Sequence, residues 1–516
     1  MYNVLSEIKT DFFEYKFNLA ISNIAFSVDH YLNMKYFISN FDKINKSNSK
    51  YTSIVLYTNN FGYFNKFNIN FNYVQKLIIG PKDYRNFCQN EKLSIPESLF
   101  YFKGIENNLL SLHIDFYYYE EKTKLGLFKR IKDFNLLEVL ELKNFRLKND
   151  TFLTLNLKNL KKLILYNCEF ICLGYYISLN LKSLNIYKCL RILYESNENK
   201  QFQQLEKLSC VDLVFYSNSY YPSSIYKTDL IDYCIKNATL KILEIDNYYN
   251  AANHNNDNFL ENFYKKIFLN NLIELKLAYD NSILKYKNKN YSITKINIFI
   301  KYAQNKYDLC EFLNEFKNLS ELKIIIKNSL GKIHEIQSLN IIENPNCKIN
   351  NLSIDCHLNF LNKLYFSIKL NIQSFENLIS LNINMPYCIL NCYKDIPILN
   401  DKCDIMFKCL KNISIICIIH ECIMENIINN FKYMPNLNYF KMNCITVNDI
   451  TENKYISFIK ALLLTKLDYL EIKINSGKKI NEYSLIELKK ILNNKYIGIK
   501  NIKINKYQKK KKLLHL

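Results

Sequence analysis

Short runs of alternating apolar and polar residues recur along the chain, and a further apolar residue stands three positions before each run. The clearest unit has the form Leu-x-x-Leu-x-Leu and consists of Leu160, Leu163 and Leu165. Units of the same form begin twenty-three residues earlier at Leu137 and twenty-one residues later at Leu181. Because successive side chains of a β-strand point to opposite faces, each unit predicts a short strand with one buried face.

The unit recurs through most of the chain at intervals of 21–35 residues, always with apolar residues three and five positions after its start. One such unit cannot bury its own apolar face, so a series predicts stacked repeats rather than separate compact domains. The seventeen candidate starts are Tyr51, Val74, Leu109, Leu137, Leu160, Leu181, Leu205, Leu240, Leu272, Ile293, Leu319, Ile349, Leu378, Leu410, Leu437, Leu467 and Ile499.

The position three residues after the last apolar residue completes the pattern. Cys168 and Cys189 occupy it in two successive units, and Asn59 and Asn475 occupy it near the two ends of the series. With this Leu-x-x-Leu-x-Leu-x-x-Cys unit the chain resembles the leucine-rich-repeat family. The resemblance implies an α/β solenoid, or horseshoe, with parallel strands on its concave face and helices or short turns on its convex face.

The intervals between strands predict what lies on the convex face. Helical spacing of apolar residues is found within 258–267, 452–464 and 482–493, so we expect helices there. Intervals of 21–24 residues leave room only for a short turn or a 3₁₀ segment.

The repeats also predict how the chain is divided. We expect an array of about seventeen irregular units over residues 49–505 and a Lys-rich tail over 506–516. Residues 1–48 contain no strand unit and are expected to cap the array. Family members that act as ubiquitin-ligase adaptors carry an F-box at this place, so a degenerate adaptor segment is the alternative.

Composition and charge narrow the range of partners. The chain carries a formal net charge of +21, with only 8 Gly, 7 Pro and no Trp, and resembles proteins from A/T-rich genomes of viruses and intracellular parasites. Nearly all its cations are Lys, which lacks the planar fork with which Arg binds phosphate and guanine, and they are interspersed with acidic residues. These features argue against dedicated nucleic-acid recognition. The run Lys509–Lys512 leaves polyanion binding as an alternative.

The sequence gives no sign of export or of a membrane span. No apolar run reaches the roughly 18 residues that a spanning helix needs, and the first residues lack the pattern of a signal peptide. We therefore expect an intracellular, cytoplasmic location, with the 16 Cys present as reduced thiols.

Candidate chemistry is sparse. Cys388 with Cys392, and Cys417 with Cys422, have zinc-site spacing, but the intervening cysteines do not, so buried free thiols are favoured over a metal site. No Gly-rich phosphate loop or hydrolase motif is found, and His113 is expected to lie on the surface rather than in a catalytic site. The sequence therefore predicts a protein without catalytic residues, cofactor or metal.

The polar positions of each strand are expected to form the concave surface. They mix Tyr with charges of both signs, as protein-binding surfaces do, because Tyr offers a large contact area at a low cost in rotamer entropy. The sequence thus predicts a non-enzymatic scaffold that binds a protein partner on this surface. The residues expected to contact the partner are Lys162, Ile164, Tyr166, Asn185, Tyr187, Lys276, Phe299, Tyr439 and Tyr469.

Overall fold

A computed structural model of the chain describes most of the repeat strands and many of the segments that join them. The described residues belong to two units, one within residues 1–256 and the other within 257–516. They are residues 24–25, 52–57, 74–80, 105–117, 121–147, 152–194, 202–211, 214–215, 239–246, 249–250, 271–278, 292–301, 306–309, 312–313, 316–327, 338–340, 349–357, 364–366, 368–369, 377–390, 407–419, 426–427, 429–446, 457, 467–475 and 501–504.

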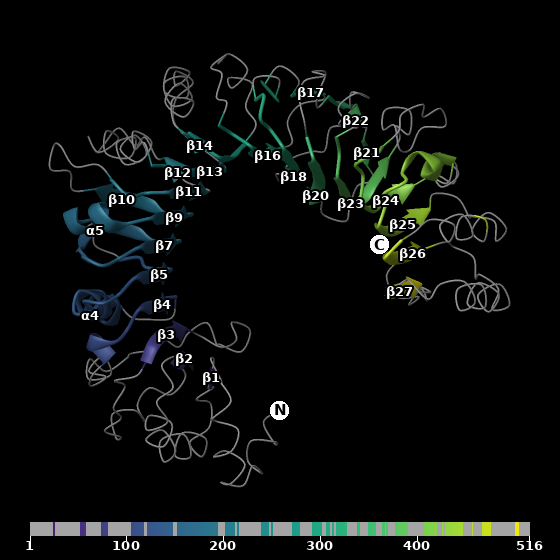
Figure 1. Cartoon of the computed structure of the whole chain (residues 1–516). Coiled ribbons are helices and arrows are strands. Elements are labelled where there is room, and N and C mark those ends of the chain that lie inside the picture. The colour runs from purple at the N-terminus through teal and green to yellow at the C-terminus, as the bar shows by residue number, and fades with distance from the viewer. Residues whose placement is uncertain are drawn as a thin grey trace, which may run out of the picture. The chain divides into compact units, whose positions relative to one another are not determined.

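The first unit is built on a ladder of parallel strands (Figure 1). Equivalent residues of successive repeats are cross-strand partners. Leu163, for example, pairs with Leu140 of the preceding repeat and with Leu184 of the following one. The strands predicted at 163–165 and 184–186 are therefore confirmed as neighbouring rungs. The ladder strands are β1 (Ile24–Ala25), β2 (Thr52–Tyr57), β3 (Val74–Gly80), β4 (Ser111–Asp115), β5 (Val139–Lys143), β7 (Lys162–Tyr166), β9 (Ser183–Tyr187), β11 (Lys207–Val211) and β13 (Ile242–Asp246).

The apolar positions of each repeat form the core of this unit. Leu160, Leu163 and Leu165 of the β7 repeat are fully buried, and the equivalent residues of the β5 and β9 repeats are at most 2% exposed. Burying a side chain of this size contributes about 1.5–3 kcal/mol. Because three such residues recur in every repeat, stacking of neighbours provides the core that a single repeat lacks.

Helices and short sheets cover the other side of the first ladder (Figure 1). In α4, Phe128 packs against Phe145 at 4.8 Å between ring centroids. These elements are η4 (Ile105–Asn107), α4 (Glu121–Ile131), α5 (Tyr175–Asn180), a parallel sheet of β6 (Leu153–Leu155), β8 (Glu169–Leu173) and β10 (Leu190–Tyr194), and the pair β12 (Val214–Phe215) and β14 (Tyr249–Asn250).

The short sheet corrects one sequence-based expectation. The interval of 21 residues from Leu160 to Leu181 was expected to hold only a turn or a 3₁₀ segment, but it holds both β8 and α5. Four consecutive residues of β8, Phe170–Leu173, are buried. A strand buried on both faces has no alternation of apolar and polar residues, so the pattern that revealed the ladder strands could not reveal this one.

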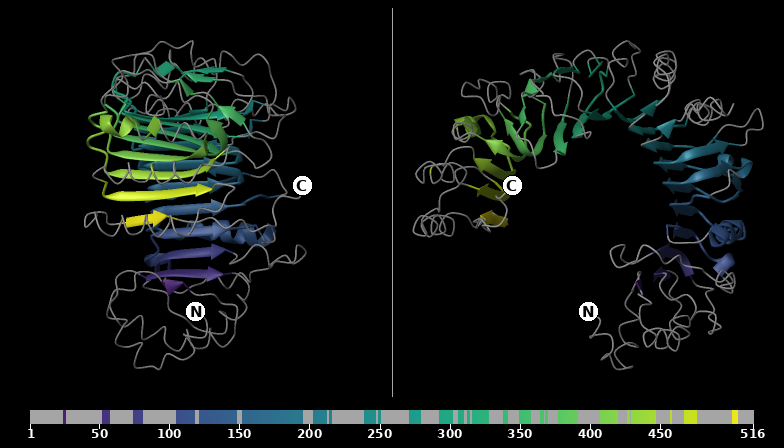
Figure 2. Two further views of the ribbon diagram at one scale, coloured as in Figure 1. Left: turned by 90° about the vertical axis from the view of Figure 1, so that its right-hand side faces the viewer. Right: turned by 180° about the vertical axis from the view of Figure 1, so that it is seen from behind.

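The second unit is built on a ladder of the same kind, whose strands lie side by side in Figure 2. The strands predicted at 275–277, 322–324 and 470–472 are confirmed within it. Its ladder strands are β15 (Glu274–Ala278), β16 (Lys295–Lys301), β18 (Glu321–Lys327), β20 (Asn351–His357), β23 (Ser380–Leu390), β24 (Asn412–Ile419), β25 (Tyr439–Thr446), β26 (Tyr469–Asn475) and β27 (Asn501–Ile504).

Shorter elements accompany the second ladder. The far end of β23 pairs with β21 (Leu364–Phe366). A separate parallel sheet contains β17 (Lys306–Asp308), β19 (Ser338–Asn340) and β22 (Ile368–Lys369), and the 3₁₀ helix η9 (Phe431–Tyr433) precedes β25.

The turns after β5, β7 and β9 repeat one geometry. Asn144, Asn167 and Lys188 directly follow these strands and have positive φ angles of 57°, 54° and 52°. Asn tolerates this left-handed conformation better than most residues do. Each of the three backbone N–H groups donates to the last carbonyl of the next strand, at 2.8–2.9 Å. The ladder of backbone hydrogen bonds therefore continues past the ends of the strands.

The cysteines that complete the repeat pattern lie inside these turns, as predicted. Cys168 and Cys189 are 1% and 3% exposed. The Cys168 thiol donates to the Leu142 carbonyl at 3.3 Å, and the Cys168 backbone N–H donates to the Cys189 sulfur at 3.3 Å. Burial raises the pKa of the Cys168 thiol well above its usual range. The seven cysteines whose side chains the structure describes are free thiols.

Several sequence-based predictions lie outside the described residues. They are the helices predicted at 258–267, 452–464 and 482–493, apart from residue 457, the Lys-rich tail, and residues 1–48 apart from β1. Of the helices that the structure describes, none is long and apolar enough to cross a membrane.

Candidate partner-binding face

Each ladder has an open face, on the side opposite the helices and short sheets, which corresponds to the predicted concave surface. The first, third and fifth residues of a five-residue ladder strand lie on it. Parallel register aligns these residues into rows that run across the strands. The middle row of the first unit contains His113, Glu141, Ile164, Asn185 and Ser209.

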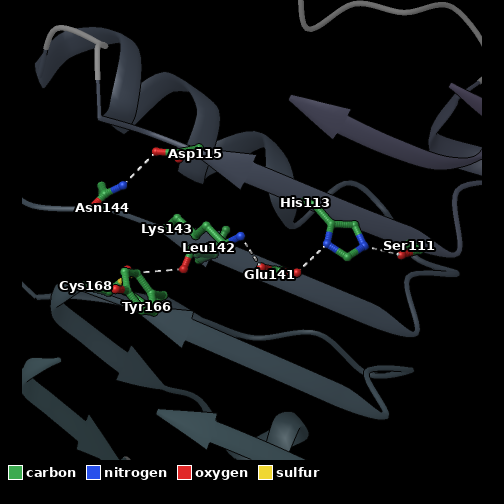
Figure 3. Close-up of polar contacts among 9 residues, drawn as sticks. All are labelled: Ser111, His113, Asp115, Glu141, Leu142, Lys143, Asn144, Tyr166 and Cys168. Atoms are coloured by element: carbon green, nitrogen blue, oxygen red, sulfur yellow. Dashed lines mark hydrogen bonds and ion pairs between the residues drawn. The ribbon is translucent and has the colours of Figure 1, made fainter. Parts of the chain in front are cut away.

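A chain of polar contacts joins β4 and β5 on this face (Figure 3). The Ser111 hydroxyl lies 3.0 Å from Nε2 of His113, whose Nδ1 lies 2.5 Å from Oε2 of Glu141. Nζ of Lys143 lies 2.8 Å from the other oxygen of the same carboxylate. The hydrogen bond from His113, with the neighbouring Lys143, lowers the pKa of Glu141 to about 2 although partial burial opposes the shift.

The order serine, histidine, carboxylate is also that of a nucleophilic triad. Acyl transfer further needs donors that stabilise the oxyanion, usually backbone N–H groups or polar side chains aimed at one point. Ser111 and His113 belong to a strand paired on both sides, so their backbone groups are engaged in the ladder. The geometry therefore supports a fixed charge network better than an acyl-transfer site.

The sequence predicts His113 to lie on the surface, and its pattern does not reveal this network. The side chains of His113 and Glu141 are only 21% and 16% exposed. Their contact crosses from one repeat to the next over 28 residues of sequence. Aligning the repeats would have placed the two residues opposite each other, because both are third in their strands.

Tyr166 and Tyr187 lie side by side where β7 and β9 end. They are cross-strand partners, their ring centroids are 6.5 Å apart, and their planes are inclined by 40°. Nζ of Lys188 lies 5.8 Å from the centroid of the Tyr166 ring, within the range of a cation–π contact. The prediction that the two tyrosines are neighbours is confirmed, and Tyr166 is 37% exposed.

Two lysines of this face lie at the opposite end of the strands from the tyrosine pair. Lys162 begins β7 and Lys207 begins β11, and in the part of the chain that the structure describes neither forms an ion pair. No carboxylate occupies the open-face positions of β7, β9 or β11. We call Lys162, Ile164, Tyr166, Tyr187 and Lys207 the Lys–Tyr patch.

The second unit holds another tyrosine pair with different chemistry. Tyr439 and Tyr469 stack at 4.5 Å between ring centroids with planes only 6° apart. The Tyr469 hydroxyl donates to Oε2 of Glu471 at 2.7 Å, and Nζ of Lys441 lies 3.4 Å from the same oxygen. Hydrogen bonding to this carboxylate, with a smaller contribution from burial, raises the pKa of Tyr469 to about 12.

The predicted contact residues differ in how far their side chains are exposed to solvent. Lys162 and Tyr166 are exposed, and Ile164, Tyr187 and Lys276 are half-buried, as are Tyr439 and Tyr469. Asn185 and Phe299 lie on the open face but are only 3% and 7% exposed, so they can contribute little contact area. The structure brings Tyr166 and Tyr187 together in one unit, and Tyr439 and Tyr469 in the other.

The cysteine-rich segment 388–422 is described only in part. Cys417 is buried in β24 and Cys409 is exposed, while Cys392, Cys403, His420 and Cys422 lie outside the described residues. Within the described ranges, no group of three or more His, Cys, Asp or Glu side chains is arranged to hold a metal ion.

Comparison with known proteins finds similarity among solved structures. Neither a protein-family model nor a curated protein matches the sequence. Among solved structures, a leucine-rich-repeat protein of Leptospira interrogans is 15% identical, with a TM-score of 0.38 over 87% of this chain and 98% of that chain. The repeated Leu-x-x-Leu-x-Leu units and the parallel ladders that they build give each unit of this chain a leucine-rich-repeat fold.

Proposed function

We propose that this protein is an interaction scaffold that seats a protein partner on the open face of its first ladder. The observation that carries the proposal is the pair Tyr166 and Tyr187, two adjacent aromatic rings on a face that the repeat's own helices and short sheets leave uncovered. Aromatic side chains at the centre of an interface supply much of its binding energy. The rows of neighbouring strands extend the contact area on both sides of the pair.

The experiment is a double substitution, Tyr166→Ala with Tyr187→Ala, tested for capture of partners from the native host cell and for thermal unfolding. Truncating an aromatic hot spot weakens binding by about 1–4 kcal/mol, so capture of a specific partner should fall sharply. The melting temperature should change little, because neither ring belongs to the buried core.

Tyr176→Ala is the matched control. Tyr176 is 40% exposed and stacks against a lysine, as Tyr166 does, but it lies on α5 on the covered side of the ladder. Capture that survives the double substitution, or that Tyr176→Ala reduces equally, would contradict the proposed location.

The adaptor alternative rests on residues 1–48. One described observation favours a cap over an adaptor: Ile24 and Ala25 pair in parallel with Ile54 and Val55 of β2, as the first rung of the ladder. Deleting residues 1–48 distinguishes the two proposals. Loss of folding supports the cap, and loss only of association with a Skp-type subunit supports the adaptor.

A further inference from the structure

We infer that the Lys–Tyr patch recognises an acidic peptide segment of the partner. This inference depends on the proposed function and specifies the chemistry of the same site. Lys162 and Lys207 stand in one row, two strands apart, or about 9–10 Å at the usual strand spacing. Ser183 lies between them, and no carboxylate in the three strands balances them.

The remaining side chains of the patch favour a peptide over a nucleic acid. Ile164 lies between Lys162 and Tyr166 on the open face, and Val211 continues the tyrosine row. Polar Ser183 stands between the two lysines, and the rest of the patch is apolar and aromatic, so the patch does not form a continuous basic groove. Nucleic-acid grooves follow a phosphate backbone with closely placed cations, commonly Arg, and no Arg occupies these strands. An acidic segment with apolar residues among its carboxylates matches this mixture.

The second ladder shows how the same fold neutralises its own lysines. Nζ of Lys295 lies 2.9 Å from Glu321, and that of Lys323 lies 2.7 Å from Asp355. Lys441 contacts Glu471 in the same way. An acidic ligand would have to displace an internal carboxylate at each of these lysines. Among the described residues Lys162 and Lys207 form no ion pair, so an acidic segment pairs with them without displacing an internal carboxylate.

The test measures fluorescence anisotropy of a labelled peptide of mixed Glu, Asp and Leu with the full-length protein at physiological salt. A Gln and Asn analogue of that peptide and a labelled oligouridine are measured in parallel. The acidic peptide should bind at least about tenfold more tightly than its neutral analogue. Lys162→Gln with Lys207→Gln should weaken it about fivefold to thirtyfold, because each exposed ion pair contributes up to about 1 kcal/mol.

Matched variants separate local contacts from net charge. Lys295→Gln with Lys441→Gln removes the same charge from the second ladder and should leave affinity within about twofold. Lys162→Glu with Lys207→Glu should abolish binding. An unchanged affinity after the Lys162 and Lys207 substitutions overturns the inference. So does equal binding of the neutral peptide, or tighter binding of the oligouridine.

Failure of this inference is distinguishable from failure of the proposed function. If the tyrosine double substitution abolishes partner capture but the acidic peptide does not bind, the interaction face stands and its acidic specificity is wrong. If the peptide binds through Lys162 and Lys207 but neither the lysine nor the tyrosine substitutions change partner capture, the proposed binding site of the partner is wrong.

Discussion

The two tyrosine pairs show how one repeat pattern produces two kinds of surface. In the second unit, Tyr439 and Tyr469 stack closely, and the Tyr469 hydroxyl shares the Glu471 carboxylate with Lys441. In the first unit, Tyr166 and Tyr187 are more loosely arranged, with a cation near the Tyr166 ring. Both pairs join neighbouring parallel strands, but the Tyr469 hydroxyl bonds to a carboxylate, whereas no carboxylate occupies the open-face positions of β7 and β9.

Strand length distinguishes the two units as well. The strands β4 to β13 of the first ladder have five residues each, whereas β16 to β26 of the second have seven to eleven. Left-handed Asn144 and Asn167 end two of the short strands, and an amide of Asn167 donates to the side-chain oxygen of Asn144 at 2.6 Å. This left-handed conformation departs from the extended backbone of β5 and β7, so these turns mark where the two strands end on the open face.

The largest effects should come from the core positions that the units share. Leu163→Ala in the first unit and Leu381→Ala in the second each truncate a side chain that is at most 1% exposed. Each should reduce the free energy of unfolding by about 2–5 kcal/mol, and Ile186→Asp should be at least as damaging because it buries an unpaired carboxylate. Denaturant unfolding measures the loss.

Hydrogen exchange locates that loss within the chain. Because repeats are stabilised mainly by their neighbours, Leu163→Ala should increase exchange most in the strands of the first unit. Lys162→Ala, on the open face, should be nearly silent. Unfolding curves for Leu163→Ala and Ile186→Asp that match the wild type would show that the buried and open positions of the strand were assigned wrongly.

A smaller effect on the free energy of unfolding should distinguish the two tyrosine pairs. Tyr469→Phe removes a hydroxyl that donates to Glu471, a residue only 5% exposed, and should reduce the free energy of unfolding by about 1–2 kcal/mol. Tyr166→Phe should change it by less than about 0.5 kcal/mol, because the Tyr166 side chain is exposed. Denaturant unfolding of both variants tests this, and equal losses would show that the pairs are not energetically different.

Much of the fold could be predicted because it depends on a repeated local pattern. Leu160, Leu163 and Leu165 encode a strand and its buried face without reference to any other repeat. The short sheet of β6, β8 and β10 could not be predicted in this way, since β8 is buried on both faces and shows no alternation of apolar and polar residues. The Cys168 thiol was placed correctly because its position within the repeat fixes its surroundings.

The candidate site was predictable only where it follows from strand position. The adjacency of Tyr166 and Tyr187 follows from their equal places in successive repeats. Whether a charge is paired depends instead on the side chain opposite it in the next repeat, as for Lys323 and Asp355. The burial of Asn185 likewise reflects packing by its neighbours, which the pattern of one strand does not contain.

A further prediction concerns the Ser111, His113, Glu141 and Lys143 network of the first open face, whose stabilisation depends on pH. The pKa of Glu141 falls from its ordinary value of 4.5 to about 2 in the folded protein, chiefly through the hydrogen bond from His113. A lowered pKa stabilises the folded state above the unfolded pKa, and that stabilisation disappears as the pH falls through the folded value. Glu141→Gln should therefore lower the melting temperature at neutral pH.

The difference in melting temperature between wild type and Glu141→Gln should narrow as the pH falls from about 4.5 to about 2, where the wild-type carboxylate also becomes neutral. Glu138→Gln is the control, because Glu138 pairs with Lys161 at an exposed position where an ion pair contributes little. A difference that stays constant down to pH 2 would mean that the carboxylate's charge does not stabilise β4 against β5. If Glu141→Gln and Glu138→Gln lower the melting temperature equally, this network stabilises the fold no more than an ordinary surface ion pair does. The internally paired charges of the second ladder would then be the stronger ones.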